Sequence, residues 1–267
     1  MSTEPLCLAC GTQYAAPRAD CPICTDERQY VPPGGQKWTD LATLRSSEEH
    51  KCRVEEQGPG IIGVGSDPRF AIGQRALLVR AASGNFLWDC VAYLDDELIG
   101  KITELGGITG IAISHPHYYT TMVEWARAFD VPIYLHENDQ QWIGRPDPSI
   151  QLWTGTTLDV SPGLQLINLG VHFAGGTVLH WPAGEEGRGA LLAGDIVQVI
   201  PDRTHVGFMY SYPNLIPERP SVVRHAAELL EPYAFEAIYG AWWDAIVRTD
   251  GHNVVQRSAK RYLTYVS

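Results

Sequence analysis

The chain has 267 residues, of which 45% are hydrophobic, so it can bury a large core in one or two domains. Its formal net charge is −11 and its 20 lysines and arginines form no cluster, which argues against nucleic acid as a partner, because affinity for a phosphate backbone depends on basic side chains. The sequence has neither a run of about 18 apolar residues nor a secretory signal pattern, so we expect a cytoplasmic protein with no membrane partner.

Four of the six cysteines lie near the start of the chain, in two Cys-x-x-Cys pairs. Cys7 and Cys10 form the first pair, and Cys21 and Cys24 form the second. Such pairs are typical of a tetrahedral four-thiolate site, and in a chain without an export signal they favour a metal over disulfides. Zinc is the expected metal, although iron also suits four thiolates. We therefore predict a structural metal-binding segment over residues 1–35, similar to a zinc ribbon or rubredoxin.

A Pro-Pro-Gly-Gly cluster at 32–35 separates this segment from the rest of the chain. We expect a linker and a short helix over 36–54, followed by a second domain over 55–267. The second domain opens with three strand-like runs at 60–64, 75–80 and 85–91. These runs predict an antiparallel meander.

Helical and strand-like patterns then alternate, which favours a layered α/β fold. We expect helices at 95–105, 119–129, 137–143, 220–230 and 253–262, and strands at 109–113, 131–136, 164–169, 176–181, 190–193 and 235–239. Residues 144–163 are predicted to be loop with at most one strand. Residues 199–217 are predicted to form a long loop, and long loops in compact domains are usually functional.

Three histidines and an aspartate occur where predicted strands end. His115 and His117 follow one strand, His172 follows a second, and Asp195 follows a third. In α/β proteins the carboxyl ends of strands usually carry the functional residues. Imidazole and carboxylate groups are also common ligands for zinc and iron. The four residues are therefore candidates for one metal site.

These motifs resemble those of the metallo-β-lactamase superfamily over about residues 55–265. His115 and His117 match the first two histidines of that family's His-x-His-x-Asp-His motif. His172, before a glycine-rich turn, and Asp195, after an apolar strand and glycine, match the second and third motifs. The resemblance implies a four-layer αβ/βα sandwich with a metal site at the open edge between its sheets. It also implies that the three histidines hold one metal, while Asp195 bridges two metals or supports a single metal's water.

The chain departs from the family motif directly after His117. Residues 118–120 read Tyr-Tyr-Thr in place of the expected Asp and His, and no histidine stands near 239–243. We therefore expect a single site in which three histidines hold one zinc or iron ion and one coordination position of that ion stays open. We predict that Asp195 and Tyr119 take part in catalysis, the tyrosine by donating a hydrogen bond to a substrate oxyanion.

Five further side chains are predicted to line the substrate pocket, because they lie next to the predicted site or in the long loop. They are Tyr118, His136, His205, Tyr210 and Trp242.

The favoured function is a metal-dependent hydrolase whose activated water attacks a small ester, lactone or thioester-like substrate. Two alternatives stay open: a mononuclear iron oxygenase or redox enzyme of the same fold, and a non-catalytic binding descendant. The expected partner is a small molecule, and a homo-oligomer is possible. The substrate itself is not predicted, because specificity would depend on the loop at 199–217.

Overall fold

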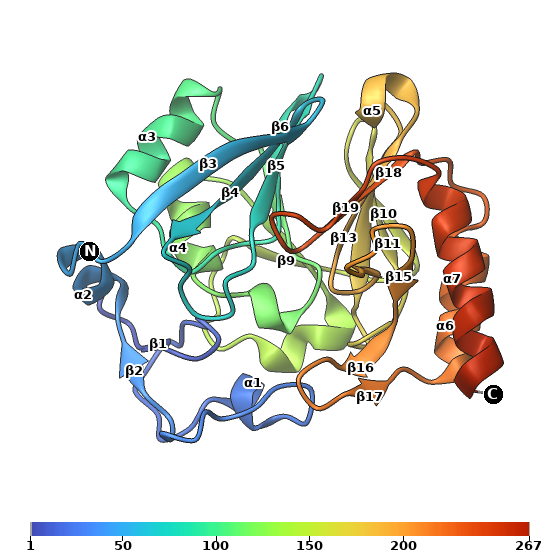
Figure 1. Ribbon diagram of the computed structural model, residues 1–267. Helices are drawn as coiled ribbons and strands as arrows, with labels where there is room; N and C mark the ends of the chain where they lie inside the picture. The colour runs from blue at the N-terminus through green and yellow to red at the C-terminus, as the bar shows by residue number, and fades with distance from the viewer. Residues whose placement is uncertain (1, 267) are drawn as a thin grey trace.

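The computed structural model describes residues 2–266 and has two β-sheets that face each other in the middle of the molecule (Figure 1). The first sheet consists, in spatial order, of β3 (Lys51–Gly58), β4 (Ile61–Asp67), β5 (Ala76–Ala81), β6 (Gly84–Trp88), β7 (Ile111–Ala112), β8 (Ile133–His136) and β9 (Ile150–Trp153). The second consists of β10 (Thr157–Ser161), β11 (Leu164–Asn168), β12 (Thr177–Trp181), β13 (Ala190–Gly194), β18 (Ala237–Gly240) and β19 (Ile246–Val247).

Helices cover the outer face of each sheet. The first sheet is covered by α3 (Asp96–Glu104) and α4 (Met122–Phe129), and the second by α6 (Pro220–Leu230) and α7 (Gly251–Val266), as Figure 1 shows. The four-layer αβ/βα arrangement implied by the family resemblance is therefore confirmed. None of the helices within residues 2–266 is long and apolar enough to cross a membrane.

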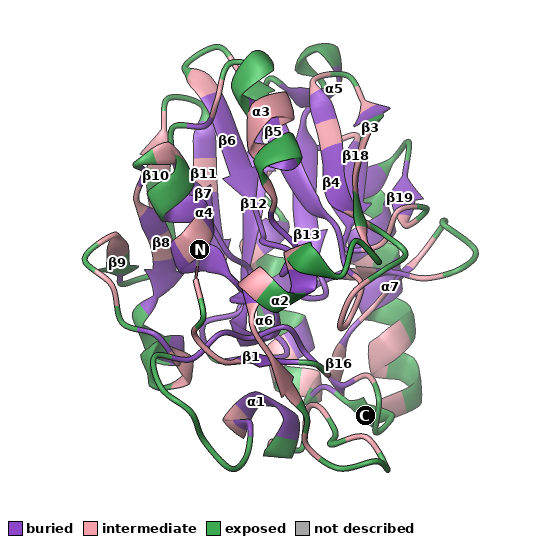
Figure 2. Cartoon of the chain, turned by 90° about the vertical axis from the view of Figure 1, so that its left-hand side faces the viewer, coloured by how far each residue is buried: buried purple, intermediate pink, exposed green. Residues whose placement is uncertain are grey.

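Both faces of each sheet are buried, because the strands alternate their side chains between two apolar layers. Leu77 and Val79 of β5 point into the layer between the sheets, whereas Leu78 points toward α3 and α4. In the second sheet Leu192 of β13 faces the first sheet, and Leu191 faces the outer helices. Figure 2 shows the resulting burial along the strands of both sheets.

Within the two large sheets, the strands that the sequence did not predict lie at the edges. β3 and β9 flank the first sheet, while β10 and β19 flank the second. An edge strand pairs on one side only and keeps more polar residues, so its apolar pattern is weak. The interval 144–163 therefore contains two strands, β9 and β10, where at most one was expected.

Two further predictions are corrected by local backbone geometry. The helix expected from residue 119 begins only at Met122, because Thr120 has a φ of +37° and the preceding residues form the 3₁₀ turn η1 (Pro116–Tyr118). The interval predicted as a long loop contains two small hairpins. They pair β14 (Gln198–Val199) with β15 (Val206–Gly207), and β16 (Met209–Ser211) with β17 (Ile216–Pro217).

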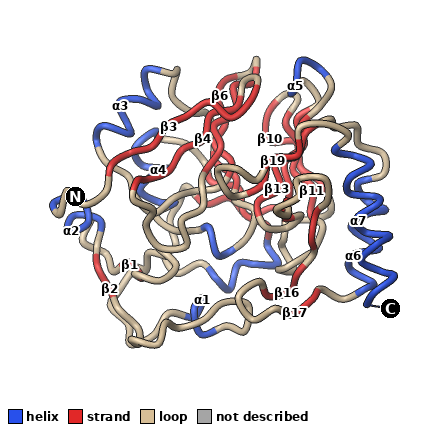
Figure 3. The backbone as a smooth tube through the Cα atoms, in the orientation of Figure 1, coloured by secondary structure: helices blue, strands red, loops and turns tan. Residues whose placement is uncertain are grey.

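The four-cysteine segment lies below the two sheets and consists mostly of loop (Figure 3). Its two strands, β1 (Leu6–Cys7) and β2 (Trp38–Thr39), pair with each other, and α1 (Pro22–Thr25) carries the last cysteine. β2 thus lies in the interval predicted as linker, which also contains α2 (Leu41–Ser46). The domain boundaries at 35 and 55 stay a prediction. The remaining short elements are η2 (Glu137–Trp142) and α5 (Gly184–Gly187).

The layer between the sheets gives a direct test of this packing. Leu192→Ala removes a fully buried side chain at the centre of that layer, and we expect it to lower the free energy of unfolding by about 2–5 kcal/mol. Chemical denaturation followed by circular dichroism measures the change. Leu215→Ala is the matched control, because Leu215 is 79% exposed and its truncation should change stability by less than about 0.5 kcal/mol. Equal losses in the two variants would contradict the assigned core.

Candidate metal centres

The carboxyl ends of β7, β11 and β13 bring the predicted site residues together. β7 pairs in parallel with β6 and β8, and β13 pairs in parallel with β18. His115 and His117 follow β7 in the turn η1, where Pro116 favours the tight 3₁₀ geometry. His172 lies in the loop between β11 and β12, at the same edge of the sandwich.

Three imidazole nitrogens, one each from His115, His117 and His172, lie within 4.8 Å of one another. Nε2 of His172 is 3.2 Å from Nδ1 of His117. Zinc–nitrogen bonds of about 2.0–2.1 Å in a tetrahedron would place neighbouring ligand nitrogens about 3.3 Å apart. Nε2 of His115 is buried and has no hydrogen-bond partner within the described residues. The three side chains therefore fit a metal ion.

Hydrogen bonds on the opposite ring nitrogens orient two of these imidazoles. Nδ1 of His172 lies 2.8 Å from the Tyr210 carbonyl oxygen, to which it can only donate, so its Nε2 lone pair points toward the site. Nδ1 of His115 lies 2.8 Å from Oγ of Ser114. The Ser114 backbone N–H in turn donates to Asp89 at 2.7 Å.

The protonation state of the three imidazoles suits metal binding. Burial lowers the pKa of His115 and His117 well below the usual value, and it lowers the pKa of His172 to about 4. All three rings are therefore neutral near pH 7. A neutral imidazole keeps the lone pair that a metal ligand needs.

His172 also has an unusual backbone conformation. Its φ of +66° lies in the left-handed region, which costs about 1–3 kcal/mol for a residue with a side chain. Its N–H donates to the carboxylate of Glu218 at 2.9 Å, and this contact helps to hold the conformation. Strain of this kind is commonly retained at binding sites.

Asp195 lies beside the three histidines without belonging to their tight group. It follows Gly194, whose φ is +54° and where a Cβ would lie 2.7 Å from Oγ of Ser114, so only glycine fits there. Tyr118 donates its hydroxyl to Oδ2 of Asp195 at 2.5 Å, and Tyr212 donates to the Asp195 backbone carbonyl at 2.7 Å. Burial raises the pKa of Asp195 to about 6, although the bond from Tyr118 acts in the opposite direction. Oδ1 has no partner within the described chain.

A cavity of about 550 Å³ opens onto His117, His172 and Asp195. A cavity of this volume suits a small molecule rather than a polymer. Trp242 lines it, as predicted from the sequence, together with Tyr212. The three polar side chains therefore meet in one concave site.

The other predicted pocket residues lie elsewhere or take different roles. Tyr119 is buried in the apolar layer under α4, and it does not line the cavity. His136 is bonded through Nε2 to the Gly155 carbonyl at 3.0 Å, and His205 pairs with Asp202 at the surface. Tyr210 contributes its backbone carbonyl to His172.

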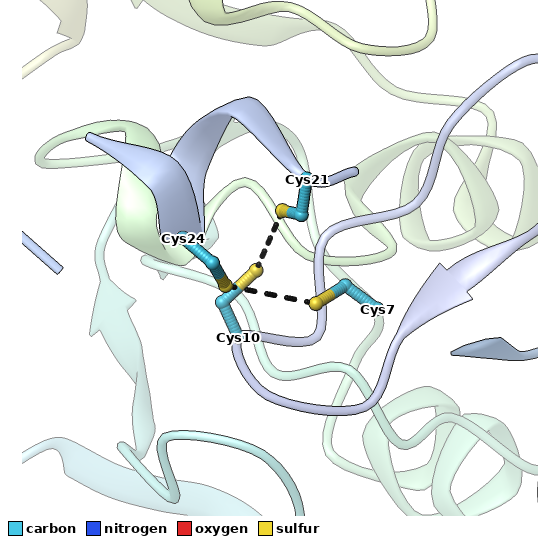
Figure 4. Close-up of side chains that lie close together, drawn as sticks. All are labelled: Cys7, Cys10, Cys21 and Cys24. Atoms are coloured by element: carbon cyan, nitrogen blue, oxygen red, sulfur yellow. Dashed lines mark hydrogen bonds between the residues drawn. The ribbon is translucent and has the colours of Figure 1, made fainter. Parts of the chain in front are cut away.

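The four cysteine sulfurs form a second group of buried ligand atoms (Figure 4). Sγ of Cys7 is 3.7 Å from Sγ of Cys24, and Sγ of Cys10 is 3.6 Å from Sγ of Cys21. Zinc–sulfur bonds of about 2.3 Å in a tetrahedron place neighbouring sulfurs about 3.8 Å apart. The cluster therefore fits a four-thiolate metal site, and this geometry suits zinc and iron alike.

Polar side chains surround these sulfurs and would stabilise their negative charge. Nε2 of Gln36 lies 3.2 Å from Sγ of Cys7, and the hydroxyl of Tyr14 lies 3.1 Å from Sγ of Cys21. Such outer contacts orient metal ligands and tune the metal. Gln36 lies beyond the predicted end of the segment at residue 35.

Sequence reasoning missed Asp89, Arg28 and Arg69. Asp89 directly follows β6 at the same sheet edge as His115, so the rule that identified Asp195 could have found it. Arg28 and Arg69 line the cavity, but each lies in a polar loop with no local motif. Only the tertiary structure brings them to the site.

No protein-family model matches the chain. The chain is 48% identical over 261 residues to the uncharacterized protein YmaE of Bacillus subtilis (strain 168), a match that covers 97% of this chain and 95% of that protein.

Solved structures are similar in fold at low sequence identity. The crystal structure of VMB-1 has a TM-score of 0.62 at 12% identity and covers 81% of this chain and 99% of its own. The DIM-1 metallo-β-lactamase has a TM-score of 0.59 at 14% identity, with coverage of 80% and 98%. A B3 metallo-β-lactamase with an active-site glutamic acid has a TM-score of 0.56 at 14% identity, with coverage of 85% and 94%. These similarities show the metallo-β-lactamase fold.

The two ligand groups predict a metal stoichiometry that elemental analysis can measure. We expect two metal ions per wild-type chain and one in Cys24→Ser after dialysis, because the variant lacks one of four thiolates. Cys52→Ser is the matched control and should keep two ions, because Cys52 lies in β3 and contacts Glu97 and Lys101 instead. An unchanged metal content in Cys24→Ser would contradict the four-thiolate site.

Proposed function

We propose that this chain is a metal-dependent hydrolase with one active-site metal. The chain belongs to the same family as YmaE, and it has the metallo-β-lactamase fold. The observation that carries the proposal is the close approach of three neutral imidazole nitrogens at the edge of a small-molecule cavity, which His117 and His172 line. Asp195 lines the same cavity, and its Oδ1 has no hydrogen-bond partner within the described residues.

The three histidines would hold the metal through Nε2 of His115, Nδ1 of His117 and Nε2 of His172. When bound there, a divalent ion supplies Lewis acidity and lowers the pKa of water toward 7. Oδ1 of Asp195 can accept a hydrogen bond from the attacking water and so orient it toward the substrate.

A single metal is favoured because Tyr118 occupies Oδ2 of Asp195, which leaves that carboxylate only Oδ1 to offer a second ion. Tyr118 directly follows His117 in the chain, and its hydroxyl donates to Oδ2 of Asp195. Within residues 2–266, the group of closely spaced ligand atoms at this edge includes the three histidines only. Asp195 alone would hold a second divalent ion weakly.

The proposed substrate is a small ester, lactone or thioester. Each offers an electrophilic carbonyl to an activated water, and each fits a cavity of about 550 Å³. Zinc and iron both remain compatible with three imidazoles, so elemental analysis of the isolated protein decides between them.

His117→Ala tests the active-site metal and the reaction together. The variant should lose one of two metal ions, and its turnover of an ester, lactone and thioester panel should fall by at least about a thousandfold, because the activated water is lost. His205→Ala is the control and should keep both metals and full activity, since His205 lies outside the cavity. Wild-type protein loaded with metal that hydrolyses no member of the panel would refute the proposal.

Substitutions of two neighbouring tyrosines distinguish a catalytic effect through Asp195 from an effect on packing alone. Tyr118→Phe removes the hydrogen bond to Asp195, and we expect kcat to fall about tenfold or more with metal content unchanged. Tyr119→Phe should leave kcat unchanged, because Tyr119 does not line the cavity. Measuring kcat, KM and metal content on both variants checks this expectation. A loss confined to Tyr119→Phe would instead support the catalytic role predicted from the sequence.

A further inference from the structure

The four-cysteine segment forms one wall of the cavity that contains the three-histidine site. Its contribution consists of Leu8, Ala9, Arg28, Gln29, Tyr30 and Pro32. In Figure 1 this segment lies along the edge of the sandwich where α1 approaches β16 and β17. The predicted four-cysteine segment therefore supplies six of the residues that line the cavity.

Specific contacts fix this wall to the rest of the cavity. The Tyr210 hydroxyl donates to the Glu27 carboxylate at 2.5 Å. The side-chain amide of Asn214 donates to the backbone carbonyls of Glu27 at 2.8 Å and Gln29 at 3.1 Å. These bonds join the stretch after the last metal-binding cysteine to the β16–β17 hairpin.

Arg28 is held firmly beside the active site. It forms a bidentate ion pair with Asp26, and its guanidinium lies 3.9 Å from the centroid of the Phe173 ring. Its Nη1 lies 3.5 Å from the backbone carbonyl of His172. A guanidinium has five N–H donors, so at least two remain free for a ligand in the cavity. Arg28 is thus preorganised as an anion-binding group.

Arg69 supplies a second positive charge at the cavity. It makes no ion pair with any other residue between 2 and 266. Its aliphatic stem packs on Gly73, where a Cβ would lie 2.8 Å from Cδ of Arg69. The stem is therefore held in place while the charged end stays exposed.

The cavity is less negative than the protein as a whole. The chain carries a net charge of −11, whereas the charged side chains that line the cavity are two arginines and Asp195, and Asp26 pairs with Arg28. The remaining lining is largely apolar, with Ile72, Pro213 and Trp242 among its residues. Arg69 would attract an anion to this cavity, because its charge is not neutralised by an ion pair within the described residues.

We propose that the four-cysteine segment is part of the substrate-binding site, and that the cavity selects a small molecule with an apolar body and an anionic group bound by Arg28 and Arg69. The anionic group is a carboxylate or a phosphate. This inference rests on the proposed function for the bond that is cleaved, but not for the binding of the anion.

Calorimetric titration of the metal-loaded protein tests the binding step without turnover. The probes are phenylacetate, phenyl phosphate and the neutral analogue benzyl alcohol. The proteins are wild type, Arg69→Gln, Arg69→Lys and the matched control Arg261→Gln, which removes one exposed charge outside the cavity. Comparing phenylacetate with phenyl phosphate distinguishes the two kinds of anion.

We expect at least one anionic probe to bind more tightly than benzyl alcohol. Arg69→Gln should weaken that binding about fivefold to tenfold, Arg69→Lys should restore part of it, and Arg261→Gln should leave it unchanged. Equal binding of all three probes would overturn the inference. Equal anion binding by Arg69→Gln and wild type would overturn it as well, because the metal alone would then account for the affinity.

A second variant tests the wall itself. Arg28→Gln removes the guanidinium from this wall, and it should weaken binding of the same anion while the metal content stays at the wild-type value. Unchanged affinity in this variant would remove Arg28 from the site.

The outcomes also separate this inference from the proposed hydrolase function. Anion binding that depends on Arg69, in a protein that hydrolyses nothing in the ester, lactone and thioester panel, would support the inference and refute the hydrolase. Hydrolysis of neutral and anionic esters with equal kcat/KM would support the hydrolase and refute the anion-selective site.

Discussion

The three histidines meet because the carboxyl ends of β7 and β11, one from each large sheet, lie at the same edge of the sandwich. Burial there removes the water that would otherwise solvate the imidazole nitrogens, and Nε2 of His115 is left without a partner in the described chain. A buried polar atom without a partner costs about 1–3 kcal/mol. The left-handed backbone at His172 adds to that cost. The apolar layers on both sides of each sheet must offset it, so the stability of the fold supports a costly but preorganised site.

The elements most visible in the sequence are those buried on both faces. β13 is apolar throughout and β5 is apolar over residues 76–79, and the pattern predicts them because each face packs against a separate layer. The edge strands β3 and β10 keep polar residues and were missed for that reason. The start of α4 was predicted three residues too early. Its apolar periodicity is present, but the positive φ of Thr120 prevents the helix from beginning before Met122.

The residues of the site also divide into those that the sequence predicts and those that it does not. His115, His117, His172 and Asp195 each stand at a strand end with recognisable spacing, so their amino-acid pattern is enough to predict that they lie together. Tyr118 and Tyr119 are adjacent and chemically identical, and only the turn η1 decides that Tyr118 reaches Asp195. Arg28 and Arg69 could not be predicted, because their place depends on how loops distant in the chain pack together.

The contacts between the four-cysteine segment and the β16–β17 hairpin also constrain the order of folding. The bond between Tyr210 and Glu27 joins residues 183 positions apart, whereas the four sulfurs lie within one short stretch near the start of the chain. A short loop closes at less entropic cost than a long one, so the segment can gather around its metal early in synthesis. The part of the cavity wall that this segment supplies would then form before the hairpin and β13, which are synthesised later. In that order, the hairpin and the edge of the sandwich would dock onto a segment already folded around its metal.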